Sequence, residues 1–401
     1  MRSLNETPIG KSQAFSIFSY GFRPFFLASS LYAILPLIPW MLYLMGEFQP
    51  NTAITTWHAH EMLFGFVGAG ISGFLLTSMP KWTNTPPLTG KGLKQLFGFW
   101  LAGRLAFWAF LFFEHPIFGY LLFLDLLLPL AQTLRIRKLL VSTENKRNYI
   151  FIAILAALVV ANFLIILDLN NITSNTASLA AILAPNIIMI TIAVIGGRVT
   201  YSFTHSYFQK TNQVIDLLKF PVLEKVALYL LVLNAIVDLI IPHSIISYTV
   251  ALIACIAHGL RLLGWKSLKT FNNPMVWVLH LGYFWLVFAL FLKASEGVLD
   301  LPHNLYLHAF TLGAVGTYML GIMTRAALGH TGRDLIASPI IVVSYLLISL
   351  AALIRILCPF FPDLYTYGMG IASLLWVISY TIYLTEYTTI LTSPRVDGQP
   401  G

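Results

Sequence analysis

The fold is decided by stretches such as NYIFIAILAALVVANFLIILD (residues 148–168), in which no charged side chain precedes Asp168. About 20 helical residues, rising 1.5 Å each, match the roughly 30 Å hydrocarbon core of a bilayer. Outward from this stretch, eleven similar runs lie near residues 25–45, 58–80, 93–113, 116–138, 177–197, 223–241, 244–264, 275–294, 304–325, 337–357 and 365–387. The sequence therefore predicts an all-α, polytopic membrane protein with twelve transmembrane helices.

The composition leaves almost no room for a soluble domain. Hydrophobic residues make up 58% of the chain and charged residues only 10%, and such a chain can place its side chains only in lipid. We expect one transmembrane domain over residues 25–387, between a cytoplasmic segment 1–24 and a cytoplasmic tail 388–401. The first 24 residues are too polar to serve as a signal peptide.

Lysine and arginine residues indicate the orientation. All but three of the 24 lie on the side that holds the N-terminal segment, the ends of the even-numbered helices and the C-terminal tail. Because cytoplasmic loops carry the excess of positive charge, both termini are predicted to be cytoplasmic. The three exceptions are Arg104, Lys293 and Arg355. The net charge of +8 is thus a topology signal, and it does not call for a nucleic-acid partner.

The two cysteines, Cys255 and Cys358, limit the kinds of cofactor. They lie alone in the eighth and eleventh predicted helices, at depths that do not favour a disulfide. The chain has no Cys-x-x-Cys-His motif and no cysteine cluster, which argues against covalent c-type haem and against an iron–sulfur centre. Any porphyrin would therefore be held without thioether links, as a b-type haem.

Histidines form an outer layer at the start of two predicted helices. His58 and His60 open the second helix, and His308 lies near the start of the tenth, with His303 just before it. Because haem iron takes one or two axial imidazoles, these residues are candidate haem ligands. Glu61 is three residues from His58 and could orient it. Alternatively, His58 and His60 merely anchor their helix at the membrane interface.

A second layer of potential ligands lies near the cytoplasmic side. Cys255 and His258 are three residues apart and share a helix face, which would suit copper or zinc. Alternatively, Cys255 packs as a small apolar residue. His280 lies in an apolar segment and needs a polar partner, so it is a candidate haem ligand, metal ligand or proton relay. His330, in a predicted loop, could complete a metal site.

The remaining histidines lie in predicted loops, and we expect no special role for them. These are His115, His205 and His243.

Four arginines are candidates for supporting roles. Arg198, Arg261 and Arg325 lie near the inner layer and Arg104 near mid-membrane. A guanidinium group can clamp an anion, such as a haem propionate or a small anionic substrate, by bidentate hydrogen bonds. Alternatively, these arginines only mark the cytoplasmic boundary, which suits Arg261 but not Arg104. Glu61 and Asp125 are possible counter-charges for Arg104.

Small residues follow one face of the second and tenth predicted helices at a spacing of four. They are Gly65, Ala69 and Gly73 in one helix and Ala309, Gly313, Thr317 and Gly321 in the other. Such faces predict tight helix packing, with direct cofactor contact as the alternative. Related polar stretches also end the second, sixth and tenth helices, which suggests three arcs of four helices.

Several motifs together give the chain a resemblance to a known family. They are GFRPFF (21–26), HAHEMLFG (58–65), GGR (196–198), LHLGY (279–283), His308 with LGAVG (312–316), MTR (323–325) and GHTGR (329–333). As a set, which spans almost the whole chain, they resemble the NnrS family. The resemblance implies a twelve-helix bacterial inner-membrane protein that contains haem and copper and acts in the response to nitric oxide and in denitrification.

The haem–copper oxidase superfamily offers a further comparison. Its main subunit binds a low-spin haem between histidines of helices 2 and 10, a part that His58 or His60 and His308 could play here. That superfamily also places copper ligands on helices 6 and 7, where this sequence has no histidine in the predicted spans. A conventional oxygen- or NO-reducing centre is therefore not expected, and any copper ligands would come from His258, His280, Cys255 or His330.

Three functions remain open from the sequence. The first is a haem- and copper-binding protein that protects against nitrosative stress by binding or processing NO or NO-derived species, with an electron donor that the sequence does not identify. The second is a secondary transporter, since twelve helices with a few buried charges is also a transporter plan. The third is a metal-free accessory factor for denitrification enzymes.

Overall fold

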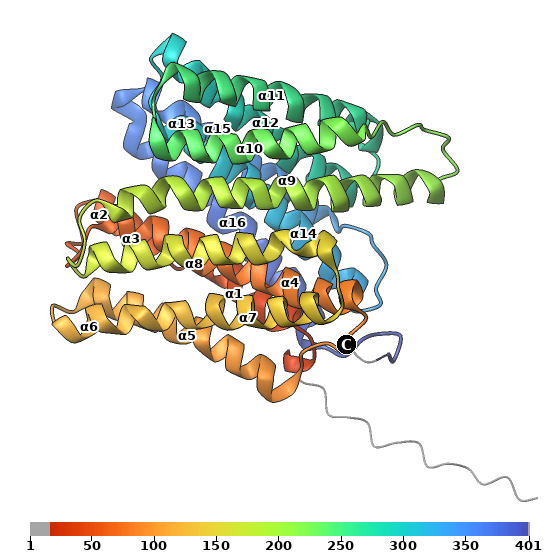
Figure 1. Ribbon diagram of the computed structural model, residues 1–401, viewed down its shortest axis with the longest axis horizontal. Helices are drawn as coiled ribbons and strands as arrows, with labels where there is room; N and C mark the ends of the chain where they lie inside the picture. Colours follow the sequence, from red (N-terminus) through yellow and green to blue (C-terminus); the bar gives the residue numbers. More distant parts are fainter. Residues whose placement is uncertain (1–16, 400–401) are drawn as a thin grey trace, which may run out of the picture.

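The computed structural model describes residues 17–399. All regular secondary structure in this part of the chain is helical, with sixteen α-helices and no strand. The predicted all-α class is therefore confirmed. The helices lie side by side as one bundle, with their axes along a common direction (Figure 1).

Eleven segments are long and apolar enough to cross a membrane. They are Phe22–Leu44 (α1, Phe22–Tyr32; α2, Leu37–Leu44), Ile54–Thr83 (α3, Ile54–His60; η2, Glu61–Phe66; α4, Val67–Thr83), Gly90–Phe112 (α5), Pro116–Ser142 (α6, Pro116–Leu121; η3, Leu122–Leu126; α7, Leu127–Ser142), Lys146–Leu169 (α8, Ile150–Leu169), Thr176–Lys210 (α9), Ile245–Gly264 (α11), Pro274–Leu299 (α12), Asn304–His330 (α13, Asn304–His308; η6, Ala309–Gly316; α14, Thr317–His330), Pro339–Phe360 (α15, Pro339–Leu357) and Pro362–Thr392 (α16, Tyr365–Thr392).

The remaining predicted span is α10 (Pro221–Ile240), which packs between α9 and α11. At 20 residues it is as long as α11, but it carries three charged residues, Glu224, Lys225 and Asp238. Asp238 is buried and bonded to Lys293 of α12, so a partner inside the protein satisfies its charge. Twelve helical segments thus form the bundle, as the sequence predicts.

The first span is not one continuous helix. α1 ends at Tyr32, a short turn covers residues 33–36, and α2 begins at Leu37. Pro36 explains the break, because a proline ring clashes with the carbonyl group four residues earlier and lacks an N–H donor. α2 therefore continues separately toward the end of the bundle where α3 begins (Figure 1).

Several helices extend beyond the apolar runs that predict them. α9 reaches Lys210 and contains Arg198 and His205, and α14 reaches His330 and contains Arg325. The expectation that His205 and His330 lie in loops is therefore wrong. Polar residues can continue a helix past the hydrocarbon core, since its backbone hydrogen bonds do not depend on side-chain polarity.

Three of the twelve segments meet at the centre of the bundle. α4, α9 and α14, from the second, sixth and tenth spans, line an apolar cavity of about 40 Å³ together with Phe26 of α1. They are the three helices whose related polar ends suggest three arcs in the sequence. The structure thus places the corresponding helices of the arcs in contact around one centre.

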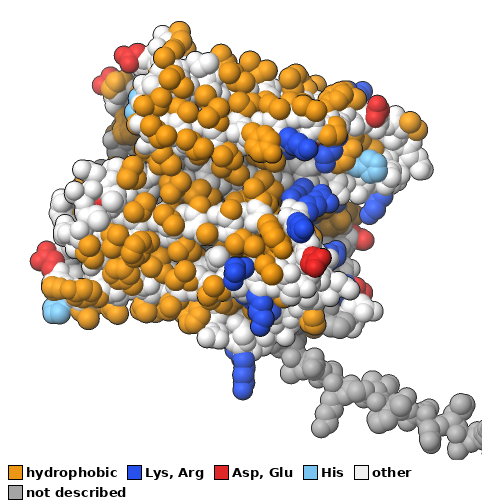
Figure 2. Space-filling view, in the orientation of Figure 1, with side chains coloured by type: hydrophobic (Ala, Val, Ile, Leu, Met, Phe, Trp, Pro, Cys, Tyr) orange, Lys and Arg blue, Asp and Glu red, His pale blue; other side chains and the backbone are white. Residues whose placement is uncertain are grey.

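The two ends of the bundle differ in charge. Hydrophobic side chains cover most of the visible side, and lysine and arginine gather at one end (Figure 2). Both ends of the described chain lie at this same end (Figure 1), which we call the inner end, and the opposite one the outer end. This arrangement agrees with the predicted topology, although Arg2 and Lys11 lie outside the described residues.

Candidate functional site

His58 and His308 lie at the outer end, on two different spans. His58 is the fifth residue of α3, and its ring stacks on Trp40 of α2 with 4.7 Å between ring centroids. Its Nδ1 atom is buried and has no hydrogen-bond partner in the described part of the chain. A buried imidazole nitrogen without a partner is costly, so this atom is available to a ligand.

His308 complements His58. Its Nδ1 donates a hydrogen bond to the Asn304 carbonyl oxygen at 2.8 Å, which leaves the lone pair on Nε2. This is the arrangement of most metal-ligating histidines, in which one ring nitrogen is fixed by a carbonyl and the other faces the metal. His58 and His308 lie close enough to interact electrostatically, and Arg355 of α15 interacts with both.

A π-helix follows the histidines in both spans. η2 (Glu61–Phe66) begins directly after His60, and η6 (Ala309–Gly316) directly after His308. π-Turns are rare and are frequent at functional sites, because the extra residue per turn changes the direction of the side chains around it. Hydropathy patterns carry no signal for such turns, so sequence reasoning missed them.

His60 belongs to a buried ion network. Its Nδ1 lies 2.9 Å from Glu61 Oε1, and its Nε2 lies 2.9 Å from Asn162 Oδ1. Asn162 donates from its amide nitrogen to Asp125, so the oxygen that faces His60 is an acceptor. Both ring nitrogens therefore donate, which is the pattern of an imidazolium.

Arg104 completes this network. Its guanidinium group bonds both Glu61 and Asp125, and Tyr32 donates to Glu61. Both carboxylates thus act as counter-charges for Arg104, as the sequence suggests. The Glu61 carboxylate points toward Arg104 and contacts His60. It does not contact His58, the histidine that the sequence suggests it could orient. The network holds two carboxylates, one guanidinium and one imidazolium, and is neutral.

The residues of the inner layer do not share a centre. His258 donates from Nε2 to the Ala227 carbonyl and bonds the Tyr283 hydroxyl through Nδ1. His280 bonds the hydroxyl groups of Thr204 and Ser267, so both rings have two partners.

Cys255 and His330 lie apart from these rings. Cys255 donates to the Val287 carbonyl, and His330 lies against the rings of Tyr20 and Phe22. Within the described residues, these four predicted metal ligands form no common site.

The inner arginines have separate partners. Arg261 donates to Glu224 at 2.8 Å. Arg325 lies over the Phe203 ring at 3.9 Å, and Arg198 donates to Asn148. Arg198 and Phe203 both line a cavity of about 370 Å³ at the inner end. Anion binding by Arg198 or Arg325 stays a prediction.

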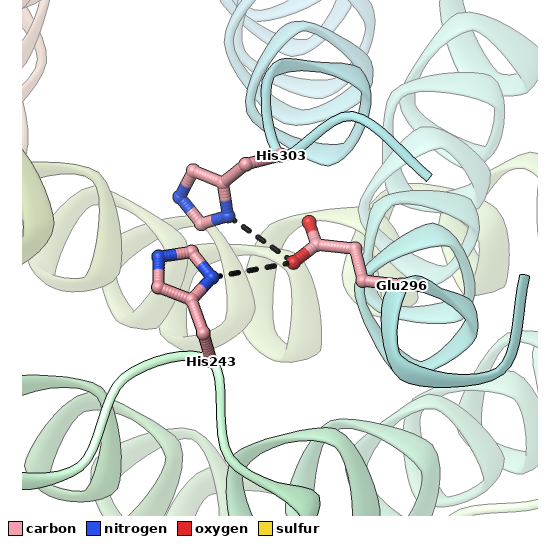
Figure 3. Close-up of side chains that lie close together, drawn as sticks. All are labelled: His243, Glu296 and His303. Carbon is pink, nitrogen blue, oxygen red and sulfur yellow. Dashed lines mark hydrogen bonds and ion pairs between the residues drawn. The ribbon is translucent and has the colours of Figure 1, made fainter. Parts of the chain in front are cut away.

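Two groups at the outer end were missed by sequence reasoning. Lys293 is buried and bonds Asp238 and Asn234 of α10; the four-residue spacing of Asn234 and Asp238 was the available signal. His243 and His303 converge on Glu296 (Figure 3). His243 was expected to have no role, because its loop position gives no hint of the neighbours that folding brings to it.

One protein-family model, described as NnrS protein, matches residues 16–395. A search of curated proteins found no match.

Proposed function

Because the chain belongs to the NnrS family, we propose that it is a haem- and copper-binding protein of a bacterial inner membrane that acts in the response to nitric oxide. In this role it would protect against nitrosative stress and take part in denitrification. Haem and copper come from the family resemblance, and the geometry of the outer histidines supports the haem part.

One observation carries the haem proposal: in the described part of the chain, His58 and His308 each offer a ring nitrogen that makes no hydrogen bond, from two neighbouring spans. Two such imidazoles would hold a non-covalent b-type haem. His60 fits less well, because both of its nitrogens are engaged. His280 fits less well for the same reason. We therefore favour His58 and His308 as the ligand pair.

The surrounding residues would serve this role in defined ways. Trp40 stacks on His58 and holds the plane of its ring. The Asn304 carbonyl fixes the tautomer of His308. Arg355 is buried and lies near both rings, where it could pair with a propionate. When bound, haem would supply an iron that takes a neutral diatomic such as NO once one of the two imidazoles gives up its position, and NO can reach it through lipid.

The ligand pair is tested by haem quantification on the purified protein and on the His58→Ala and His308→Ala variants. We expect each substitution to remove most of the haem or to abolish a low-spin ferric signal in paramagnetic resonance. His205→Ala, which changes an exposed ring at the inner end, is the control. Unchanged haem content and signal in both outer variants would refute the assignment.

A transporter is the second candidate, and the buried ion pairs favour it. Arg104 with Glu61, Lys293 with Asp238 and Arg261 with Glu224 are ionised groups between different spans, and such pairs often mark ion pathways. A colourless protein that catalyses substrate-dependent uptake in proteoliposomes would support this function against the first.

A further inference from the structure

We propose that His243, Glu296 and His303 bind one divalent first-row transition-metal ion at the outer end of the bundle. The three residues come from different segments. His243 lies in the loop between α10 and α11, Glu296 in the last turns of α12, and His303 directly before α13. Their potential ligand atoms lie within 4.8 Å of one another (Figure 3).

The spacing of the ligand atoms fits a small metal ion. Glu296 Oε2 lies 3.2 Å from His303 Nδ1 and 3.8 Å from His243 Nδ1. Ligand bonds of about 2.0–2.2 Å in a tetrahedral site separate the ligand atoms by roughly 3.3 Å. An ion therefore needs only a small movement of the exposed His243 ring.

The donor set selects the class of ion. Two imidazoles and one carboxylate form the set found in open zinc sites, in which water occupies the remaining position. The same nitrogen and oxygen donors suit copper(II), whereas calcium and magnesium prefer oxygen alone. The two imidazole side chains are 53% and 40% exposed, so an ion can enter from the outside and retain water.

Charge gives an independent reason for a cation here. The Glu296 side chain is 5% exposed, and its Oε1 atom is buried without a hydrogen-bond partner in the described residues. Lys293, one turn earlier in α12, donates to Asp238 at 2.6 Å and is already paired. Asp238 therefore occupies the nearest lysine. Glu296 is left without it, and a buried carboxylate without a cationic partner is unfavourable. A bound ion would supply the missing charge.

The site uses neither His58 nor His308, so it can be tested apart from the haem proposal. The purified full-length protein is stripped with a chelator and titrated separately with zinc and with copper(II). We expect one bound ion per chain with either metal. We also expect the paramagnetic resonance spectrum of copper(II) to show coupling to two nitrogens.

Three variants and one control decide the assignment. His243→Ala, His303→Ala and Glu296→Gln should each weaken binding more than about tenfold, since even indirect contacts to a metal contribute that much. His115→Ala, an exposed histidine at the outer end, should bind as the wild type does. His243→Ala alters a loop side chain and remains informative if the Glu296 variant does not fold.

Some results would overturn the site. These are wild-type affinity in both histidine variants, or equal loss in His115→Ala. The same titration on the His58→Ala/His308→Ala protein should retain the ion, so loss of haem and loss of this site give different results. Failure of the wild-type protein to bind either ion would also overturn the site. It would mean that hydrogen bonds from the two imidazoles alone satisfy the Glu296 carboxylate.

Discussion

At the scale of single residues, the outer half of the bundle depends on buried charges that balance one another. Arg104 is 2% exposed and contacts two carboxylates, while His60 contacts the same carboxylates through its two nitrogens. A neutral set of this kind avoids the large penalty of an unpaired charge in a low-dielectric interior. Replacing one charged residue of the network should therefore lower the free energy of unfolding by more than that residue's own interactions contribute.

Arg104→Gln tests this balance. The substitution leaves Glu61 and Asp125 with only His60 as a counter-charge, and we expect a loss of about 3–5 kcal/mol in the free energy of unfolding. Thermal unfolding in detergent, followed by circular dichroism, would measure it. Arg137→Gln, on the exposed face of α7, should change stability little. Equal stability of the two variants would show that the network is not important for folding.

Lys293 and Asp238 provide a second test of paired charge. Lys293→Met should be strongly destabilising, because it leaves the Asp238 carboxylate buried among Asn186 and Asn234. Adding Asp238→Asn removes that charge and should recover more than half of the loss. Melting temperatures of the two single variants and the double variant form a double-mutant cycle. Additive effects would contradict a direct pair.

Residue-level reasoning from sequence reached only part of this. Arg104 in an apolar helix requires counter-charges, and Glu61 and Asp125 could be named because few carboxylates lie in the spans. The sequence could not rank His58 against His60 as a ligand, because side chains two positions apart on a helix point in very different directions. The π-helix that begins at Glu61 adds a further rotation that no hydropathy pattern encodes.

At the scale of helices, the apolar runs predicted the spans but not their interruptions or ends. Pro36 breaks the first span, and polar turns extend α9 and α14 beyond the runs. The small-residue faces were predicted to admit close neighbours, and they do. A Cβ atom on Gly65 would collide with the Tyr32 ring and with Arg104. Close approach at this glycine therefore allows the ion network to form.

Two glycine substitutions should have effects of opposite sign. Gly65→Ala forces Tyr32 and Arg104 to move, and we expect a loss of about 1–3 kcal/mol. Gly98→Ala in α5 meets open space, so the better helix propensity of alanine should stabilise the protein by up to about 1 kcal/mol. Melting temperatures of the two variants test this, and a shift of the same sign in both would contradict it.

At the scale of the whole molecule, three buried cations away from the inner end explain where the outer polar groups lie. These cations are Arg104, Lys293 and Arg355. They are also the three cations that the sequence analysis places outside the cytoplasmic excess of positive charge. Arg104 bonds the carboxylates of Glu61 and Asp125, which also contact His60. Lys293 lies near Glu296, and Arg355 lies near His58 and His308. The three cations that lie outside the cytoplasmic excess of positive charge are thus each part of, or next to, a polar site of the outer half.

The orientation of the bundle is the property on which all outer sites depend. In a protein lacking both native cysteines (Cys255→Ala, Cys358→Ala), Glu114→Cys adds a thiol at the outer end and Lys138→Cys adds one at the inner end. Because positive charge is retained in the cytoplasm, a membrane-impermeant maleimide added to intact cells should label the first thiol and not the second. Permeabilised cells, in which both should react, control for reactivity. Labelling of the Lys138 variant alone in intact cells would invert the topology, and would place His58, His308 and the His243 site on the cytoplasmic side.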